Sequence, residues 1–153
     1  MKTSILDATK IQARIVIPIV KALERELGKE AAHEIVGRAI AENYVAWREK
    51  IGFTENSHPR ADGDGQGDTP DFPVEREIVE DTDQAFGHNI TGCAFADYFR
   101  AIGEPEIGAL MTCGVDFAAE TRIRPDWEFT RTQTRMQGAP CCDFRWRKRA
   151  AAE

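Results

Sequence analysis

Two consecutive stretches of helical periodicity at the start of the chain constrain its fold more than any other feature. Apolar residues step by three and four across residues 13–27, and the same steps continue across residues 29–51. Each pattern is typical of one face of an amphipathic helix. Gly28 separates the stretches, and Pro18 predicts either a kink or a helix start. We therefore expect an antiparallel helix pair that packs on a further layer of structure.

The apolar period changes after residue 73. Alternating side chains predict four strands, at 74–83, 84–91, 126–134 and 142–147. Between the second and third of these, residues 93–101 have helical spacing, and Pro105 begins another helical stretch that continues towards Ala119. The predicted fold class is α+β: an N-terminal helix pair packed on a small antiparallel sheet of about four strands, with helices inserted between strands two and three.

The length and the distribution of loop residues predict the domain organisation. A chain of 153 residues has the usual size of one domain, so we expect residues 1–153 to form a single domain. Residues 54–72 interrupt the pattern with glycines, aspartates and prolines, which predicts a mobile surface loop.

The charge balance limits the classes of partner. The chain has 20 Lys and Arg against 26 Asp and Glu, a formal charge of −6. This argues against nucleic acid or an anionic membrane as a partner, because both favour excess positive charge. The longest near-apolar stretch, residues 13–23, is charged at Arg14 and Lys21 and too short to cross a bilayer. Without a signal-peptide pattern, we expect a cytoplasmic protein that binds a small molecule, as a monomer or as a homo-oligomer.

All four cysteines fall in the last 61 residues of the chain. In a reducing compartment they are expected to be thiols rather than disulfides. Cys113 and Asp116 are three residues apart, so a helix would carry this thiol and carboxylate on one face. In the last predicted strand, Cys142 points to one face and Asp143 and Arg145 point together to the other.

Two mechanisms stay open for these residues, and His88 is a candidate general base because an ordinary histidine pKa is near 6.5. In the first, a cysteine thiolate is the nucleophile. In the second, Cys93, Cys113, Cys142 and His88 bind a metal that activates water. The usual spacing of metal-binding cysteines is absent, so no cofactor is predicted, although zinc or another divalent metal suits the residue types. Each cysteine could instead be a small buried apolar residue.

Short motifs follow one another in a characteristic order between about residues 13 and 147, outside the glycine-rich loop. They are ARIVIPI at 13–19, EIV at 34–36, TGCAFADYF at 91–99, GEPEIG at 103–108, CGVD at 113–116, RTQT at 131–134, MQG at 136–138 and CDFR at 142–145. This set resembles the L-2-amino-thiazoline-4-carboxylic acid hydrolase family. Cys141 stands where the family pattern often has histidine.

The resemblance implies a hydrolase that opens a C–N bond of a cyclic amidine, converting 2-aminothiazoline-4-carboxylate into a carbamoyl-cysteine. A carboxylate would hold the amidinium, and an arginine would hold the substrate carboxylate. The expected catalytic residues are Cys113, Cys142, Asp116 and His88. The expected substrate-binding residues are Arg145, Asp143, Arg131 and Cys93. The alternative is a non-catalytic domain on the same fold that binds a small ligand or senses a metal or redox state.

Overall fold

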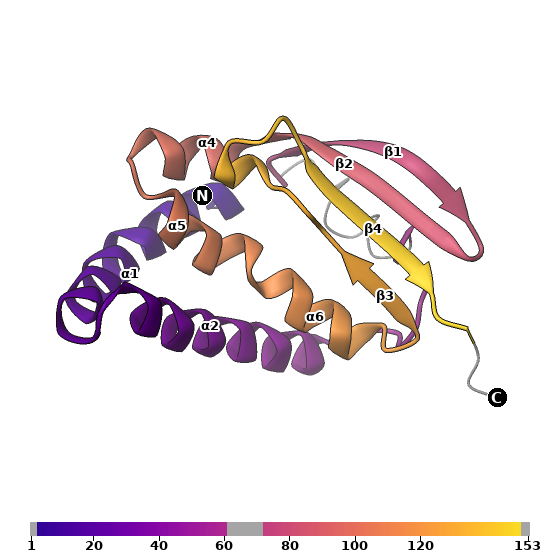
Figure 1. The fold of residues 1–153 in the computed structure, drawn as a ribbon, viewed down its shortest axis with the longest axis horizontal. Coiled ribbons are helices and arrows are strands. Elements are labelled where there is room, and N and C mark those ends of the chain that lie inside the picture. The colour runs from indigo at the N-terminus through magenta and orange to yellow at the C-terminus, as the bar shows by residue number, and fades with distance from the viewer. Residues whose placement is uncertain (1–2, 61–71, 151–153) are drawn as a thin grey trace.

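The protein is built from a layer of helices and one antiparallel sheet, as the computed structural model in Figure 1 shows. The structure describes residues 3–60 and 72–150. The element order is two helices, two strands, a series of helices and two further strands. This confirms the predicted α+β class and the insertion of helices between the second and third strands.

The predicted N-terminal helix pair consists of α1 (Ile5–Leu27) and α2 (Lys29–Ile51). Gly28 joins the two helices at a φ of +83°, in the region that favours glycine. The first helix begins earlier than residue 13 because the Ser4 side chain caps it, accepting a hydrogen bond from a backbone N–H of the first turn. Pro18 lies inside α1, so the prediction that the regular helix could start there was wrong.

The sheet has the strand order β1-β2-β4-β3, and every neighbouring pair is antiparallel. Its strands are β1 (Val74–Thr82), β2 (Ala85–Cys93), β3 (Trp127–Thr130) and β4 (Cys142–Lys148). The late pair of strands therefore joins the early pair through the contact of β2 with β4.

Strand β3 is shorter than the predicted strand at 126–134. After Thr130 the backbone N–H groups of Thr132 and Gln133 donate to the Asp143 carboxylate instead of a neighbouring strand. This contact turns the chain out of the sheet. A short 3-10 helix (Arg135–Gln137) follows before the chain returns as β4.

The inserted helices run from the end of β2 back towards β3. They are α4 (Ala94–Ala101), α5 (Pro105–Gly108), a π-helical turn (Ala109–Cys113) and α6 (Val115–Ile123). Gly108 lies directly against the Phe99 ring, and any larger side chain there would clash with it. In Figure 1 α6 lies beside α2 and faces the sheet, whereas α4 lies at the other end of the helical layer, near α1.

The apolar core has two separate centres. Ala13, Ala96, Phe99 and Met136 pack together where α1 meets α4. A second group, Phe86, Trp127 and Trp146, packs on the helix-facing side of the sheet. Among the described residues, no helix is long and apolar enough to cross a membrane.

The predicted loop at 54–72 lies largely outside the described residues. Its described first part is held in place by hydrogen bonds. The N–H of Asn56 donates to the carbonyl of Ile123 over 2.9 Å, and Nε2 of His58 lies 2.8 Å from the carbonyl oxygen of Thr82. These contacts join the chain after α2 both to the end of α6 and to β1.

Candidate functional site

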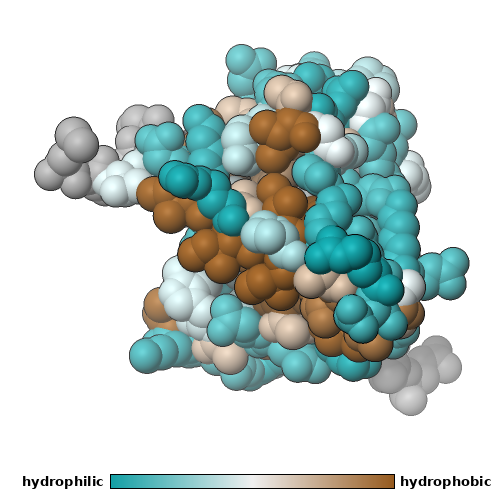
Figure 2. All heavy atoms as spheres, turned by 90° about the vertical axis from the view of Figure 1, so that its left-hand side faces the viewer, coloured by the Kyte–Doolittle hydropathy of each residue, from teal (hydrophilic) through white to brown (hydrophobic). Residues whose placement is uncertain are grey.

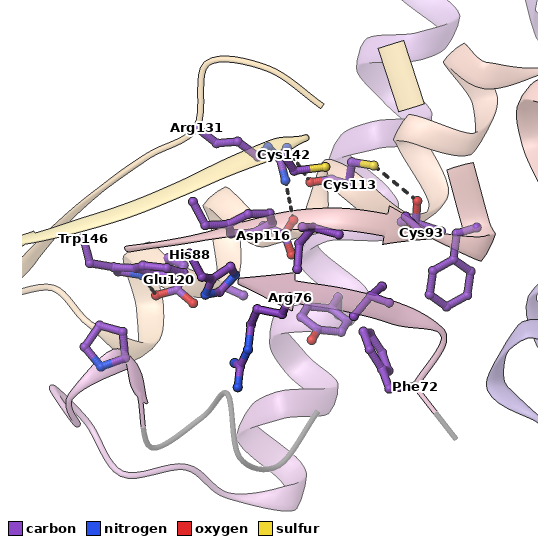
Figure 3. A pocket seen from close by; sticks show the side chains of 18 of the residues that line it. Phe72, Arg76, His88, Cys93, Cys113, Asp116, Glu120, Arg131, Cys142 and Trp146 are labelled. Atoms are coloured by element: carbon purple, nitrogen blue, oxygen red, sulfur yellow. Dashed lines mark hydrogen bonds and ion pairs between the residues drawn. The ribbon is translucent and has the colours of Figure 1, made fainter. Parts of the chain in front are cut away.

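A cavity of about 220 Å³ lies between one face of the sheet and helices α2 and α6 (Figure 3). Its wall is mostly apolar, with a small number of charged groups and thiols among the apolar side chains. Cavities of this kind are the usual place for small ligands. Six of the eight predicted site residues line this cavity.

The pleat of the sheet decides which side chains reach the cavity. His88 and Ile90 of β2 lie opposite Phe144 and Cys142 of β4, and all four line the cavity. Residues directly opposite in an antiparallel pair share a face, and diagonal neighbours on that face are about 7–8 Å apart. His88 and Cys142 are such a diagonal pair. A small ligand between them would reach both.

Helix α6 supplies the carboxylates of the site. Asp116 and Glu120 are one turn apart, so both side chains point from the same helix face into the cavity. The preceding π-helical turn ends at Cys113, which also lines the cavity. Cys113 and Asp116 thus come from two successive helical segments, and both line the same cavity.

Asp116 forms an ion pair with Arg131. Nη1 of Arg131 donates to Oδ2 of Asp116 over 2.5 Å, and Nη2 donates to the carbonyl of Cys113 over 3.0 Å. Burial raises the pKa of Asp116 to about 6, although the charge of Arg131 acts in the opposite direction. This carboxyl group is therefore poised to change its charge close to neutral pH.

Three thiols converge on one end of the cavity. Cys93, Cys113 and Cys142 all line it, and Figure 3 shows the sulfur atoms of Cys113 and Cys142 beside the Arg131–Asp116 pair. The convergence follows from the fold, because the three cysteines come from the end of β2, the π-helical turn and the start of β4.

Each of these thiols has a different hydrogen bond. Sγ of Cys142 accepts from the N–H of Arg135 over 3.2 Å, and Sγ of Cys93 accepts from the first turn of α4 over 3.5 Å. Sγ of Cys113 lies 3.4 Å from the hydroxyl of Thr112. Burial raises the pKa of all three thiols, that of Cys113 to about 11. Because burial raises their pKa values above that of an ordinary thiol, these cysteines are protonated at neutral pH.

His88 is a neutral imidazole in the wall of the cavity. Its ring stacks on Phe144 with 4.9 Å between the ring centroids. Burial, and then the positive charges of Arg76 and Arg145, lower its pKa to about 3. Its buried Nδ1 has no hydrogen-bond partner among the described residues. A pKa this low disfavours proton uptake near neutral pH, so His88 faces the cavity as an uncharged hydrogen-bonding group.

Several charged residues of the cavity were missed by the sequence reasoning. Glu120 accepts two hydrogen bonds from Nη1 of the buried Arg124, at 2.9 and 2.7 Å, and one from Nε1 of Trp146 at 2.7 Å. Arg76 of β1 and Arg48 of α2 complete the charged part of the wall. The sequence did contain a signal for Glu120 and Arg124. They follow Asp116 at intervals of four residues, which places all three on one side of a helix.

Asp143 and Arg145 do not line the cavity, because the alternation of β4 points them to the opposite face of the sheet from Cys142. Arg145 donates to the carbonyl of His88 over 3.0 Å and to Oδ1 of Asn89 over 2.9 Å. Asp143 and Arg145 are therefore separated from the other six predicted site residues, all of which line the cavity.

The Asp143 carboxylate instead holds the turn after β3. It accepts from the N–H and the hydroxyl of Thr132, at 2.8 and 2.5 Å, and from the N–H of Gln133 at 2.9 Å. Burial opposes ionisation of Asp143, but these hydrogen bonds outweigh it and lower the pKa. Cys141 lies near this turn, 3.3 Å from the side-chain nitrogen of Gln133, and does not line the cavity.

The same geometry bears on the metal-binding alternative. Across residues 3–60 and 72–150, no group of three or more His, Cys, Asp or Glu side chains is arranged to hold a metal ion. The three thiols and His88 therefore share a cavity without forming a recognisable ligand set in the described part of the chain.

Comparison with known proteins places the chain in one family. The model of the L-2-amino-thiazoline-4-carboxylic acid hydrolase family matches residues 8–146, which is most of the 153-residue chain. Proteins with curated descriptions gave no match to this sequence. The matched range includes every residue described above as lining the cavity.

Proposed function

The chain belongs to the L-2-amino-thiazoline-4-carboxylic acid hydrolase family, whose members hydrolyse C–N bonds of cyclic amidines, and we propose that it opens the ring of 2-aminothiazoline-4-carboxylate in the cavity between α6 and the sheet. The observation that carries this proposal is the convergence of Cys113, Cys142 and Asp116 on that cavity. It brings a nucleophile and an anion to one small apolar space.

Asp116 is the proposed anchor for the amidinium group of the substrate. An amidinium offers parallel N–H donors, which match the two oxygens of a carboxylate. The ion pair with Arg131 fixes one oxygen, Oδ2, and so orients the other. Glu120, one turn further along α6, lies on the same side of the cavity and is paired with Arg124.

Arg76 is the proposed partner of the substrate carboxylate. Arg131 was expected for this role, but it lies against Asp116, the proposed anchor of the amidinium, and so stands at the other end of the substrate. Arg76 enters the cavity from β1, on the other side of the space from α6. A substrate with an amidinium and a carboxylate at opposite ends fits between these two charges.

Cys142 is the proposed nucleophile. Its Sγ already accepts a backbone N–H, a contact that stabilises a thiolate, and it shares a strand face with the neutral His88. Burial raises the pKa of this thiol, and an amidinium bound nearby lowers it, because a positive charge favours the thiolate. Substrate binding itself therefore activates the thiol.

The proposed reaction has two steps. The thiol of Cys142 adds to the ring carbon that carries the exocyclic amino group, and its proton passes to the ring nitrogen. The bond from that carbon to the ring nitrogen then breaks, and the nitrogen leaves as an amine. Water replaces the enzyme sulfur in the second step, which yields the carbamoyl product and the free thiol.

Incubation of the purified chain with 2-aminothiazoline-4-carboxylate tests this function. The expected result is a ring-opened product whose mass exceeds that of the substrate by one water, formed with many turnovers per protein molecule. Saturable binding with no product would contradict the proposal and favour the non-catalytic ligand-binding alternative.

A further inference from the structure

Helix α1 is apolar on two opposite faces. Its inner face packs into the protein through Thr9, Ala13 and Val20. On its outer face, Ile11, Ile15 and Ile19 keep 56%, 62% and 54% of their surface exposed. Figure 2 looks at the side of the molecule that carries α1, and hydrophobic side chains gather across the middle of this face. A helix that is apolar on both sides is usually covered on both sides.

The outer face of α1 forms a straight stripe. Helical geometry places Ala8 and Ala22 in line with the three isoleucines, within about 80° around the helix. All five of these residues are uncharged and lie on one side over four turns. Single exposed apolar residues are normal on a monomer, but a continuous stripe of this length marks a contact surface.

We propose that this stripe, defined as Ala8, Ile11, Ile15, Ile19 and Ala22, packs against the same stripe of a second copy of this chain, with the two α1 helices antiparallel. The stripe is symmetric about Ile15. In an antiparallel pair centred there, Ile15 meets its own copy, each Ile11 meets an Ile19, and each Ala8 meets an Ala22. A two-fold dimer requires this kind of self-complementary surface.

The charges beside the stripe fit a second copy with the same register. Asp7 and Arg25 lie on the same flank of the stripe, at its opposite ends. In the antiparallel pair, Asp7 of one chain lies opposite residue 23 of the other chain, so Arg25 of that second chain is within its reach. The two-fold symmetry forms the same contact a second time. Arg14 is the charged side chain of this flank closest to the two-fold axis, and it is exposed, so its long side chain has room to extend into solvent.

The proposal is tested by measuring the mass of the full chain in solution over a range of concentrations by sedimentation. The wild-type chain is expected to be a dimer, and Ile15→Lys to raise its dissociation constant roughly 30-fold or more, because Ile15 is central to the interface. Ile51→Lys is the matched control, since Ile51 lies at the end of α2 with 56% of its surface exposed, close to the 62% of Ile15, and a cation is tolerated there.

A charge exchange tests the register of the helices. Asp7→Lys and Arg25→Glu should each weaken the dimer several-fold, and the double variant should recover most of the loss, because the pair is restored with its signs reversed. A monomeric wild-type chain, or an Ile15→Lys variant that dimerises as well as Ile51→Lys, would overturn the proposal. Failure of the double variant to recover would overturn the antiparallel register.

Discussion

Oδ2 of Asp116 and Nη1 of Arg131 lie 2.5 Å apart, and this ion pair joins helix α6 to the segment that follows strand β3. The guanidinium is almost fully buried, with 7% of its side chain exposed, whereas Asp116 keeps 31% of its side chain exposed. The Asp116 carboxylate is thus held by the buried Arg131 and remains accessible from the cavity. Its ionisation should control the binding of a cationic substrate.

The activity should depend on pH through Asp116. Burial raises the pKa of this carboxyl to about 6, so it is largely protonated below that pH and cannot hold an amidinium by charge. We expect kcat/KM to rise with pH through about 6 and then level off. Asp116→Asn should lower kcat/KM by roughly 100-fold and remove this rise. A variant that keeps the same pH profile would contradict the role of Asp116.

Arg131 should set the position of that pH profile. Removal of its positive charge in Arg131→Gln takes away the main influence that lowers the pKa of Asp116, so the rise in kcat/KM should move above pH 6. Arg131→Lys should shift it less, because the charge remains. Arg145→Gln is the control, since Arg145 lies on the other face of the sheet. Equal shifts in the Arg131 and Arg145 variants would disagree with this placement.

His88 should make the folded state sensitive to acid. Its pKa of about 3 in the folded state lies below the ordinary value of 6.5, so between these values the unfolded chain binds a proton that the folded chain does not. The free energy of unfolding therefore falls as pH decreases through this range, by up to about 1.4 kcal/mol per pH unit.

Denaturant unfolding at several pH values would measure this effect. His88→Gln should show a smaller loss of stability between pH 6.5 and pH 3. Asp116→Asn should instead lose more stability than the wild-type chain as pH falls from about 6 to 4. The folded-state pKa of Asp116 is raised, so protonation of this carboxyl group favours the wild-type folded chain at low pH. An unchanged slope in His88→Gln would contradict the burial of a neutral imidazole.

Asp143 should be important for stability rather than for turnover. Its carboxylate accepts three hydrogen bonds that hold the turn after β3, so Asp143→Ala should lower the free energy of unfolding by about 2 kcal/mol. Below its unfolding temperature the variant should keep kcat within a few-fold of wild type. An Asp143→Ala variant with unchanged stability and no activity would place this residue in the reaction after all.

The order of the elements could be predicted from the sequence because apolar periodicity reports which residues face a core. The helix pair, the strands and the inserted helices all follow from that pattern. The end of β3 could not be predicted, because it depends on a carboxylate more than ten positions away, Asp143, which takes the N–H groups that would have continued the strand. Such a contact leaves no periodic signal.

The site was predictable in its residue types and less so in its geometry. The convergence of Cys93, Cys113 and Cys142 depends on the strand order β1-β2-β4-β3, which a single sequence does not reveal. Strand alternation alone predicts that Cys142 and Arg145 face opposite sides of the sheet. The family motif nevertheless suggested that both residues act in one site. Motif membership indicates that residues occur together in a family, whereas the pleat decides which of them face one space.

The most direct test of the central claim compares two adjacent thiols in one assay. Hydrolysis of 2-aminothiazoline-4-carboxylate is measured for the wild-type chain, Cys142→Ala and Cys141→Ala, after circular dichroism has established that each variant is folded. Cys142 lines the cavity and Cys141 does not. We predict that Cys141→Ala retains wild-type turnover and that Cys142→Ala loses it by roughly 1,000-fold or more. Equal turnover in the two variants would contradict catalysis by the Cys142 thiol.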